Sequence, residues 1–199
     1  MNRVVQEVRI VAGSLRGRKL KFPDAPGLRP TPDRVRETLF NWLAPHIAGT
    51  RVLDLFAGSG ALGFEAMSRG AARVMLVESN QAVATLLREA VIRFGLGNAR
   101  VESTDALAYL KRAMLPGGDG PFDLIFLDPP FASGLQRPAL DRIVELGILA
   151  PGGFCYLESP RRAAIAPLPE GWTLHRSGTA GEVGYHLLHV QPRDLPRDV

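Results

Sequence analysis

The chain has 199 residues, 46% hydrophobic and 22% charged, which favours a single folded domain with a sizeable core and excludes a disordered protein. No apolar run approaches the roughly 20 residues of a membrane helix, and residues 1–7 lack the apolar block of a signal peptide, so we expect a cytoplasmic protein. Cys155 is the single cysteine, which excludes an internal disulfide and a cysteine zinc cluster. The four histidines have no metal-ligand spacing, so we expect no metal.

The net charge of +4 conceals an excess of basic residues at the amino-terminal end. Residues 1–49 hold nine Arg and Lys against four Asp and Glu, whereas residues 50–199 hold 15 against 16. Most of the basic residues are Arg, whose planar guanidinium fits phosphate oxygens and stacks on bases. This pattern indicates a surface for nucleic acid; the alternative is a solvated surface in an arginine-rich chain.

The first 30 residues read as an appendage. Residues 8–12 and 18–22 flank a glycine-containing loop and predict a hairpin with basic side chains on one face. A proline-rich stretch follows, after which Thr31 or Asp33 could cap a helix that carries apolar residues up to Leu43. We therefore divide the chain into an extension, residues 1–30, and a main domain, residues 31–199.

From residue 51 onward, short apolar strands alternate with helical stretches, which is typical of an α/β sheet. We expect strands at 51–56, 73–78, 99–103, 122–127 and 153–158, and helices at 60–69, 80–94, 104–113 and 135–146. Two final strands, 172–177 and 184–190, are separated by a segment too short for a helical crossover. The pattern predicts five parallel strands followed by an antiparallel hairpin: a seven-stranded, mostly parallel sheet whose last strand is antiparallel.

The first strand of this domain ends in a glycine-rich turn. Gly58 and Gly60 allow the backbone to turn tightly and to approach a ligand closely where the next helix starts. The residues match the dinucleotide fingerprint G-x-G-x-x-G, which is weak evidence alone. Asp54 would repel a pyrophosphate but could hold the cationic amino-acid group of a ligand.

Acidic residues also follow the second and third strands. Glu78 lies 18 residues after Gly60, where a carboxylate usually receives the hydroxyl pair of a ribose. Glu78 could instead cap the next helix, although Asn80 is also placed to do so. Asp105 could accept the amine of an adenine, or cap the helix that it precedes.

The fourth strand ends in Asp128-Pro129-Pro130-Phe131. The prolines have no amide hydrogen, which leaves the carbonyl groups of this loop free to point at the N–H groups of a planar amine. Asp128 adds a charged acceptor and Phe131 a flat apolar face; the alternative is a plain strand terminator. Because carboxyl ends of parallel strands share one edge, this clamp should lie beside the glycine turn, and the pair favours S-adenosylmethionine, which has no phosphate.

These motifs resemble those of the Rossmann-like S-adenosylmethionine-dependent amino-methyltransferases (class I). Within them the chain is similar to the bacterial RsmD family, which methylates the exocyclic N2 amine of one guanine in 16S rRNA of the small ribosomal subunit. The resemblance runs nearly end to end, and its most specific blocks are residues 9–13, 16–20, 29–31 and 33–43.

The resemblance implies three sets of site residues. The catalytic set is Asp128, Pro129, Pro130 and Phe131. The set for S-adenosylmethionine is Thr31, Arg34, Asp54, Phe56, Ala57, Gly58, Ser59, Gly60, Glu78, Ser79, Asp105 and Ala106. The RNA-binding set is Arg16, Arg18, Lys19 and Arg36. We expect a monomer whose partner is 16S rRNA, in an assembled or partly assembled small subunit, and no metal or membrane.

Other functions remain open. A DNA or RNA adenine-N6 methyltransferase would use the same clamp and glycine turn, but the chain lacks an evident target-recognition insert. A non-catalytic RNA-binding module would keep the basic hairpin and lose the clamp. A nicotinamide-dependent oxidoreductase would need a hydride-transfer acid, which is not evident, and cytosine C5 chemistry would need a thiol in a loop, whereas Cys155 is expected in a strand.

Overall fold

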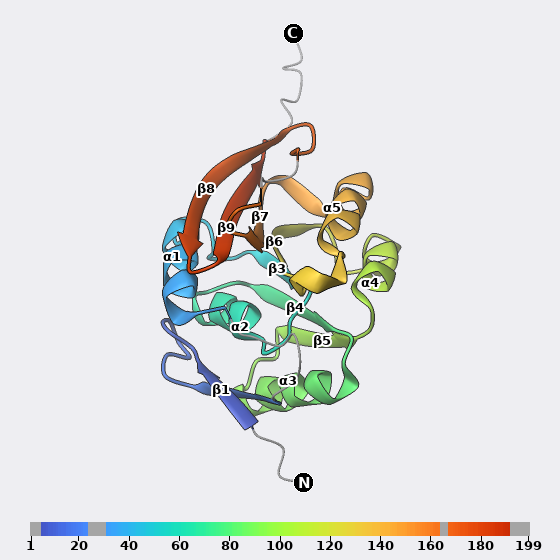
Figure 1. The fold of residues 1–199 in the computed structure, drawn as a ribbon. Helices are drawn as coiled ribbons and strands as arrows, with labels where there is room; N and C mark the ends of the chain where they lie inside the picture. Colours follow the sequence, from blue (N-terminus) through green and yellow to red (C-terminus); the bar gives the residue numbers. More distant parts are fainter. Residues whose placement is uncertain (1–4, 24–30, 164–166, 192–199) are drawn as a thin grey trace.

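The computed structural model describes residues 5–23, 31–163 and 167–191. Its centre is a seven-stranded sheet in the order β5-β4-β3-β6-β7-β9-β8 (Figure 1). The strands are β3 (Arg51–Asp54), β4 (Arg73–Glu78), β5 (Ala99–Ser103), β6 (Phe122–Leu127), β7 (Leu149–Pro160), β8 (Trp172–Ala180) and β9 (Val183–Val190). Strands β3 to β7 are mutually parallel, and β9 is antiparallel to both β7 and β8, which confirms the predicted fold class and the final hairpin.

Five α-helices cover the two faces of the sheet within the described residues (Figure 1). They are α1 (Asp33–Leu43), α2 (Ala61–Ser68), α3 (Gln81–Phe94), α4 (Ala106–Ala113) and α5 (Gln136–Glu145), with a short 3-10 helix η1 at Phe131–Ser133. Helices α1 to α3 share one hydrophobic cluster with Val52, Leu124 and Phe126, whereas α4 and α5 share the other with Leu53 and Ile125. Successive side chains of a strand therefore point alternately into the two hydrophobic cores on opposite faces of the sheet.

The direction of the chain changes between β3 and β6. From β3 the chain moves outward through β4 to β5, and then returns to β6 on the other side of β3. In an open α/β sheet, ligands bind beyond the carboxyl ends of the strands at such a switch point. The glycine turn follows β3 and the Asp128 loop follows β6, so both motifs lie at this position.

The amino-terminal hairpin forms a separate two-stranded antiparallel sheet, β1 (Val5–Arg9) with β2 (Lys19–Pro23). Its apolar side chains, among them Ile10 and Phe22, enter the same core as α1 to α3. The first strand ends at Arg9, before the predicted boundary, because the Val11 and Ala12 N–H groups donate to the Glu65 carboxylate at 2.8 and 3.0 Å. The hairpin is thus fastened to α2 and is continuous with the core.

The start of α1 differs from the prediction. Pro32 occupies the N-cap position and no side chain caps the helix, so the prediction of Thr31 or Asp33 as the cap is wrong. The Thr31 hydroxyl donates to Glu158 at 3.2 Å, and the Asp33 carboxylate accepts from Arg36 at 2.6 Å. Both side chains have other partners.

No described helix is both long and apolar enough to cross a membrane.

Candidate active site

The turn between β3 and α2 requires its glycines. Gly58 and Gly60 have φ angles of 50° and 77°, in the left-handed region that side chains disfavour. A Cβ atom at Gly60 would also lie 2.7 Å from Leu87 and Phe64 side-chain atoms. The turn brings the backbone of residues 57–60 to the carboxyl edge of the sheet, as the sequence predicted.

Asp54 supports this turn from below. Its side chain is buried, and its Oδ2 accepts a hydrogen bond from the Gly63 N–H at 2.9 Å. Burial raises the pKa of Asp54 to about 7, with a smaller contribution from the charge of Glu78. No ion pair neutralises Asp54 within the described residues. A buried carboxylate without a counter-charge suits a cationic ligand.

Glu78 holds the turn from the neighbouring strand. Its Oε2 accepts from the Gly58 N–H at 2.9 Å, and its Oε1 accepts from the Asn80 N–H at 2.7 Å. Asn80 caps α3, because its side chain accepts from the Ala82 and Val83 N–H groups. The structure therefore places Glu78 on the glycine turn and gives the capping role to Asn80.

Asp105 caps α4. Its Oδ1 accepts from the Ala108 N–H at 3.0 Å, which is the capping alternative left open by the sequence. Asp105 still lies at the carboxyl edge, next to the buried Ala106. A role for its second oxygen toward an adenine amine stays a prediction.

The Asp128 loop lies beside the glycine turn. Asp128 is half-buried, and its carboxylate accepts no hydrogen bond from the described residues. Its pKa is raised well above the usual value, first by burial and then by the charges of Glu158 and Asp54. Pro129 is buried, whereas Phe131, the first residue of η1, is half exposed. An acceptor and an exposed aromatic face thus stand together at the edge.

Glu158 was missed by sequence reasoning, which treated it as the last residue of a core strand. It is buried at the carboxyl edge of β7, where its Oε1 accepts from the Tyr156 hydroxyl at 2.7 Å and from Thr31 at 3.2 Å. Burial raises the pKa of Glu158, and the two hydrogen bonds oppose this shift. The rule that selected Asp54, Glu78 and Asp128, an acid at the end of a parallel strand, would have selected it too.

The remaining cofactor candidates vary in exposure. Ala57 and Ser59 are buried, Phe56 is half-buried, and Ser79 and Arg34 are exposed. Thr31, a predicted cofactor residue, donates its hydroxyl to Glu158 on β7, two strands away from Asp54 on β3. Its contact with the cofactor stays a prediction.

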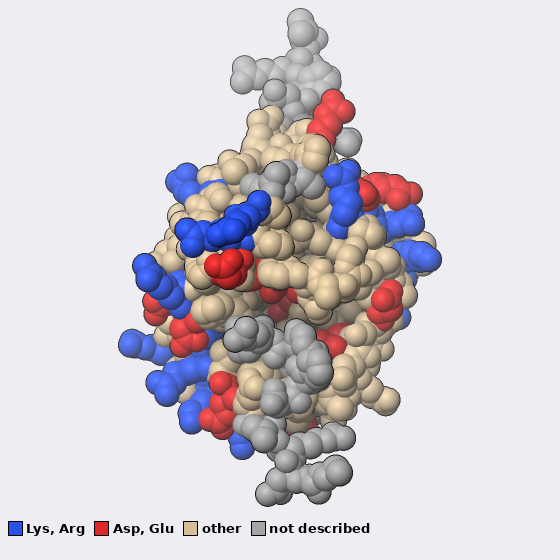
Figure 2. Space-filling model, viewed as in Figure 1, with Lys and Arg blue, Asp and Glu red and all other residues tan. Residues whose placement is uncertain are grey.

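Of the four candidates for RNA contact, three are on the surface. Arg16, Arg18 and Lys19 are exposed; Lys19 pairs with Glu7 at 2.8 Å, and Arg18 lies over the ring of Phe94. Figure 2 shows basic side chains concentrated along the lower left of this face and acidic side chains in a hollow near its centre. The hairpin therefore offers cations beside an acidic centre.

The prediction that Arg36 binds RNA is wrong. Its side chain is fully buried, and the guanidinium donates to Asp33 and to the backbone oxygens of Arg9 and Thr31. It also lies 3.6 Å from Glu65, the residue that holds the hairpin. Arg36 is a structural link between α1, the hairpin and α2.

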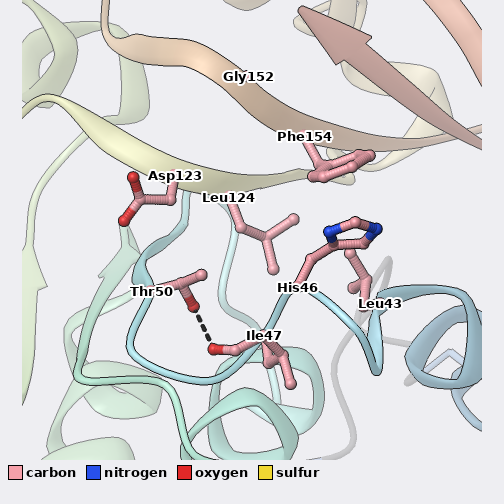
Figure 3. Close-up of a pocket in the computed structure, with 8 residues that line it drawn as sticks. All are labelled: Leu43, His46, Ile47, Thr50, Asp123, Leu124, Gly152 and Phe154. Atoms are coloured by element: carbon pink, nitrogen blue, oxygen red, sulfur yellow. Dashed lines mark hydrogen bonds between the residues drawn. The ribbon is translucent and has the colours of Figure 1, made fainter.

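A cavity of about 190 Å³ lies elsewhere, at the amino ends of β3 and β6. Figure 3 shows the residues that line it. It is lined by residues that precede or begin strands, among them Thr50, Asp123 and Leu124, and by His46 and Phe154. The Asp123 carboxylate accepts from the Arg51 N–H at 2.7 Å, and the Thr50 hydroxyl donates to the Ile47 oxygen at 2.7 Å. These polar groups have structural partners.

Within the described residues, no cluster of three His, Cys, Asp or Glu could hold a metal ion.

Comparisons with known proteins cover almost the whole chain. The model of a family described as Conserved hypothetical protein 95 matches residues 8–189. The protein named Ribosomal RNA small subunit methyltransferase D of Escherichia coli (strain K12) is 45% identical over 181 residues, which are 91% of this chain and 89% of that protein. The protein of the same name from Haemophilus influenzae is 43% identical, over 91% of this chain and 93% of that protein. A solved structure described as a putative methyltransferase yhhF from Escherichia coli has a TM-score of 0.84 at 41% identity, and covers 94% of this chain and 100% of its own.

Proposed function

Because the chain belongs to the family of Conserved hypothetical protein 95, together with the ribosomal RNA small subunit methyltransferases D, we propose that it transfers a methyl group from S-adenosylmethionine to the exocyclic N2 amine of a guanine in 16S rRNA. The observation that carries this proposal is the meeting of two loops at the switch point of the sheet. One is the glycine turn braced by Asp54 and Glu78, and the other is the loop that begins at Asp128.

The cofactor fits the residues at this edge. Asp54 and Glu78 provide negative charge without a paired cation among the described residues, which suits the ammonium group and the ribose hydroxyls and opposes a pyrophosphate. The glycines at 58 and 60 allow backbone contact, and Asp105 and Ala106 flank the position for the adenine. Bound there, S-adenosylmethionine supplies a methyl group on a positively charged sulfur.

The protein's part in the chemistry is to prepare the amine. The lone pair of the guanine N2 is delocalised into the ring, and acceptors that hold the amine hydrogens favour the pyramidal nitrogen that can attack. The Asp128 carboxylate and the Pro129 carbonyl supply these acceptors, and Phe131 stacks on the base. Holding the amine in line with the methyl group contributes on the order of 7–11 kcal/mol in ideal cases.

The proposal extends to partner and place. We place the exposed Arg16, Arg18 and Lys19 of the residue 1–30 extension on RNA phosphates, and the transfer chemistry in residues 31–199. A base in folded RNA must be exposed to reach the Asp128 loop, so an assembled or partly assembled small subunit in the cytoplasm is the substrate, and one copy of the chain carries all the named groups.

The test is incubation with tritiated S-adenosylmethionine and small ribosomal subunits that lack the modification, followed by nucleoside analysis of the RNA. Label in N2-methylguanosine is expected. Label in N6-methyladenosine would favour the adenine alternative, and no label with any RNA would favour the non-catalytic module. Naked 16S rRNA, run beside the subunits, tests the assembled substrate.

A further inference from the structure

Two carboxylates stand side by side at the acceptor end of the site. In the pairing of β6 with β7, Leu127 lies opposite Leu157, so Asp128 and Glu158 are the next residues on adjacent strands, which run about 4.8 Å apart. In both strands the residues two positions earlier, Phe126 and Tyr156, belong to the core that contains α1. Both carboxylates therefore lie on the same side of the sheet.

Glu158 is held in place on one side only. Its Oε1 accepts from the Tyr156 and Thr31 hydroxyls, and its backbone oxygen accepts from the side chain of Gln136 at the start of α5. Its Oε2 has no hydrogen-bond donor among the described residues, and neither carboxylate has an ion-pair partner there. Oε2 is accessible, because the buried side-chain atoms without a partner in the described part of the chain are Arg36 Nη1 and the Tyr109 hydroxyl. An accessible carboxylate oxygen without a donor is available to a ligand that carries donors.

The order of strands separates this pair from the cofactor turn. Asp54 ends β3, Asp128 follows β6, and Glu158 lies two residues before the end of β7, with β6 in the middle. Glu158 is thus two strands away from the glycine turn, on the side of Asp128 where the acceptor base must enter. Glu158 is therefore placed to contact the base. It is too far from Asp54 to contact a ligand group held there.

We propose that Glu158 is a specificity-determining residue that accepts the N1–H of the target guanine while Asp128 accepts an N2–H. This inference rests on the proposed function. The Watson–Crick edge of guanine carries two adjacent donors, N1–H and N2–H₂, which match two adjacent carboxylates. Adenine has a lone pair at N1, which the Glu158 carboxylate would repel. The pair therefore selects guanine, and Thr31 and Tyr156 are positioning residues for it.

The probe is 2-aminopurine, which keeps the 2-amine but has a lone pair at N1. Small subunits are reconstituted with guanine or with 2-aminopurine at the target, once mapping of labelled RNA fragments has located it, and kcat/KM is measured for both. The wild type should prefer guanine by about 10- to 100-fold, the range that one good base contact provides. Glu158→Gln, whose amide can donate to N1, should lower this preference at least fivefold. Tyr156→Phe, which frees Oε1, should lower it by less.

Glu170→Gln is the matched control, because Glu170 is exposed and has no hydrogen bond or ion pair with the described residues. The preference of this variant should equal that of the wild type. Calorimetry of S-adenosylmethionine binding and thermal melting establish that each variant is folded. An unchanged preference in both Glu158→Gln and Tyr156→Phe would overturn the inference. Failure of the wild type to methylate guanine N2 would be a different result, since it would refute the proposed function itself.

Discussion

At the scale of single residues, the site consists of carboxylates with different partners. Asp54 and Glu78 each accept a backbone N–H of the β3–α2 segment, and Asp105 accepts one in α4. Asp128 accepts none within the described residues, so its carboxylate is free for a substrate. Asp54, Glu78 and Asp105 therefore each have a structural role in a turn or a helix, whereas no contact among the described residues gives Asp128 one.

Replacing Asp128 should separate chemistry from cofactor binding. Asp128→Asn keeps the shape but removes the charged acceptor, and we expect kcat to fall on the order of 100-fold or more. Affinity for S-adenosylmethionine should stay within a few-fold, because the glycine turn is braced by other residues. Single-turnover methylation and calorimetry give the two quantities. Equal losses in both would mean that Asp128 contacts the cofactor.

Cofactor binding should depend on pH through Asp54. Burial raises the pKa of this carboxyl to about 7 in the free protein, and a ligand ammonium favours the ionised form. Binding must then release a proton below pH 7, so affinity should strengthen by up to about tenfold per pH unit as the pH rises toward 7, and level off above it. Calorimetry from pH 5.5 to 8.5 measures this slope. Asp54→Asn should flatten it; an unchanged slope would assign the titration to Asp128 or Glu158.

At the scale of elements, the structure explains which predictions from the sequence succeeded. The five parallel strands, the final hairpin and the edge that holds Asp54, Glu78 and Asp128 follow from apolar runs and from the shared direction of parallel strands. These are local patterns, and they predicted the shared edge correctly, whereas the strand order that makes it a switch point comes from the structure.

Long-range contacts account for what the sequence could not predict. Arg36 looks like part of a basic cluster, but its burial depends on Glu65, which is distant in sequence. Thr31 looks like a cap, but its hydroxyl donates to Glu158 at the far end of the chain. A buried partner gives a polar residue a structural role in place of the functional or capping role predicted for it. Because that partner is distant in sequence, the neighbouring residues cannot reveal it.

The hairpin should supply RNA affinity through exposed charge. Arg16→Gln with Arg18→Gln removes two cations, so binding should weaken and the slope of log affinity against log salt should decrease by roughly 1.5 to 2. Cosedimentation of the chain with small subunits between roughly 50 and 300 mM salt gives the slope. The control is Arg137→Gln with Arg142→Gln, an equal change of charge on α5, where both arginines pair with acids of their own helix. An equal effect of the control pair would show that net charge matters and that the hairpin does not bind RNA.

At the scale of the whole molecule, three acids without an ion-pair partner in the described part of the chain lie at the carboxyl ends of neighbouring strands. Asp54, Asp128 and Glu158 all have raised pKa values, with burial as the first cause of each. Ionised, they oppose folding, and they are tolerated because a cationic cofactor and a base with donors complement them. The fold thus gives up stability at neutral pH for a site that binds its ligands.

The sign of this effect predicts how stability depends on pH. Because folding raises these pKa values, the folded chain binds more protons than the unfolded chain between about pH 4 and pH 7. The stabilisation of the fold by the protonated forms of these three acids is therefore fully present below the ordinary carboxyl pKa. It is lost as the pH rises through the raised pKa values. Asp128→Asn removes one such charge, so it should raise the melting temperature at pH 8 by about 2–4 °C per kcal/mol gained, and by less at pH 5.

Thermal melting of the ligand-free chain at both pH values measures this difference. Glu170→Gln changes an exposed acid that has no hydrogen bond or ion pair within the described ranges, so it should change neither melting temperature. Since the same Asp128→Asn change should abolish most turnover, gain of stability and loss of activity would come from one carboxylate. A variant that melts lower than the wild type at pH 8 would mean that Asp128 stabilises the fold. The ionised Asp128 carboxylate would then gain a stabilising interaction in solution that outweighs the cost of its burial.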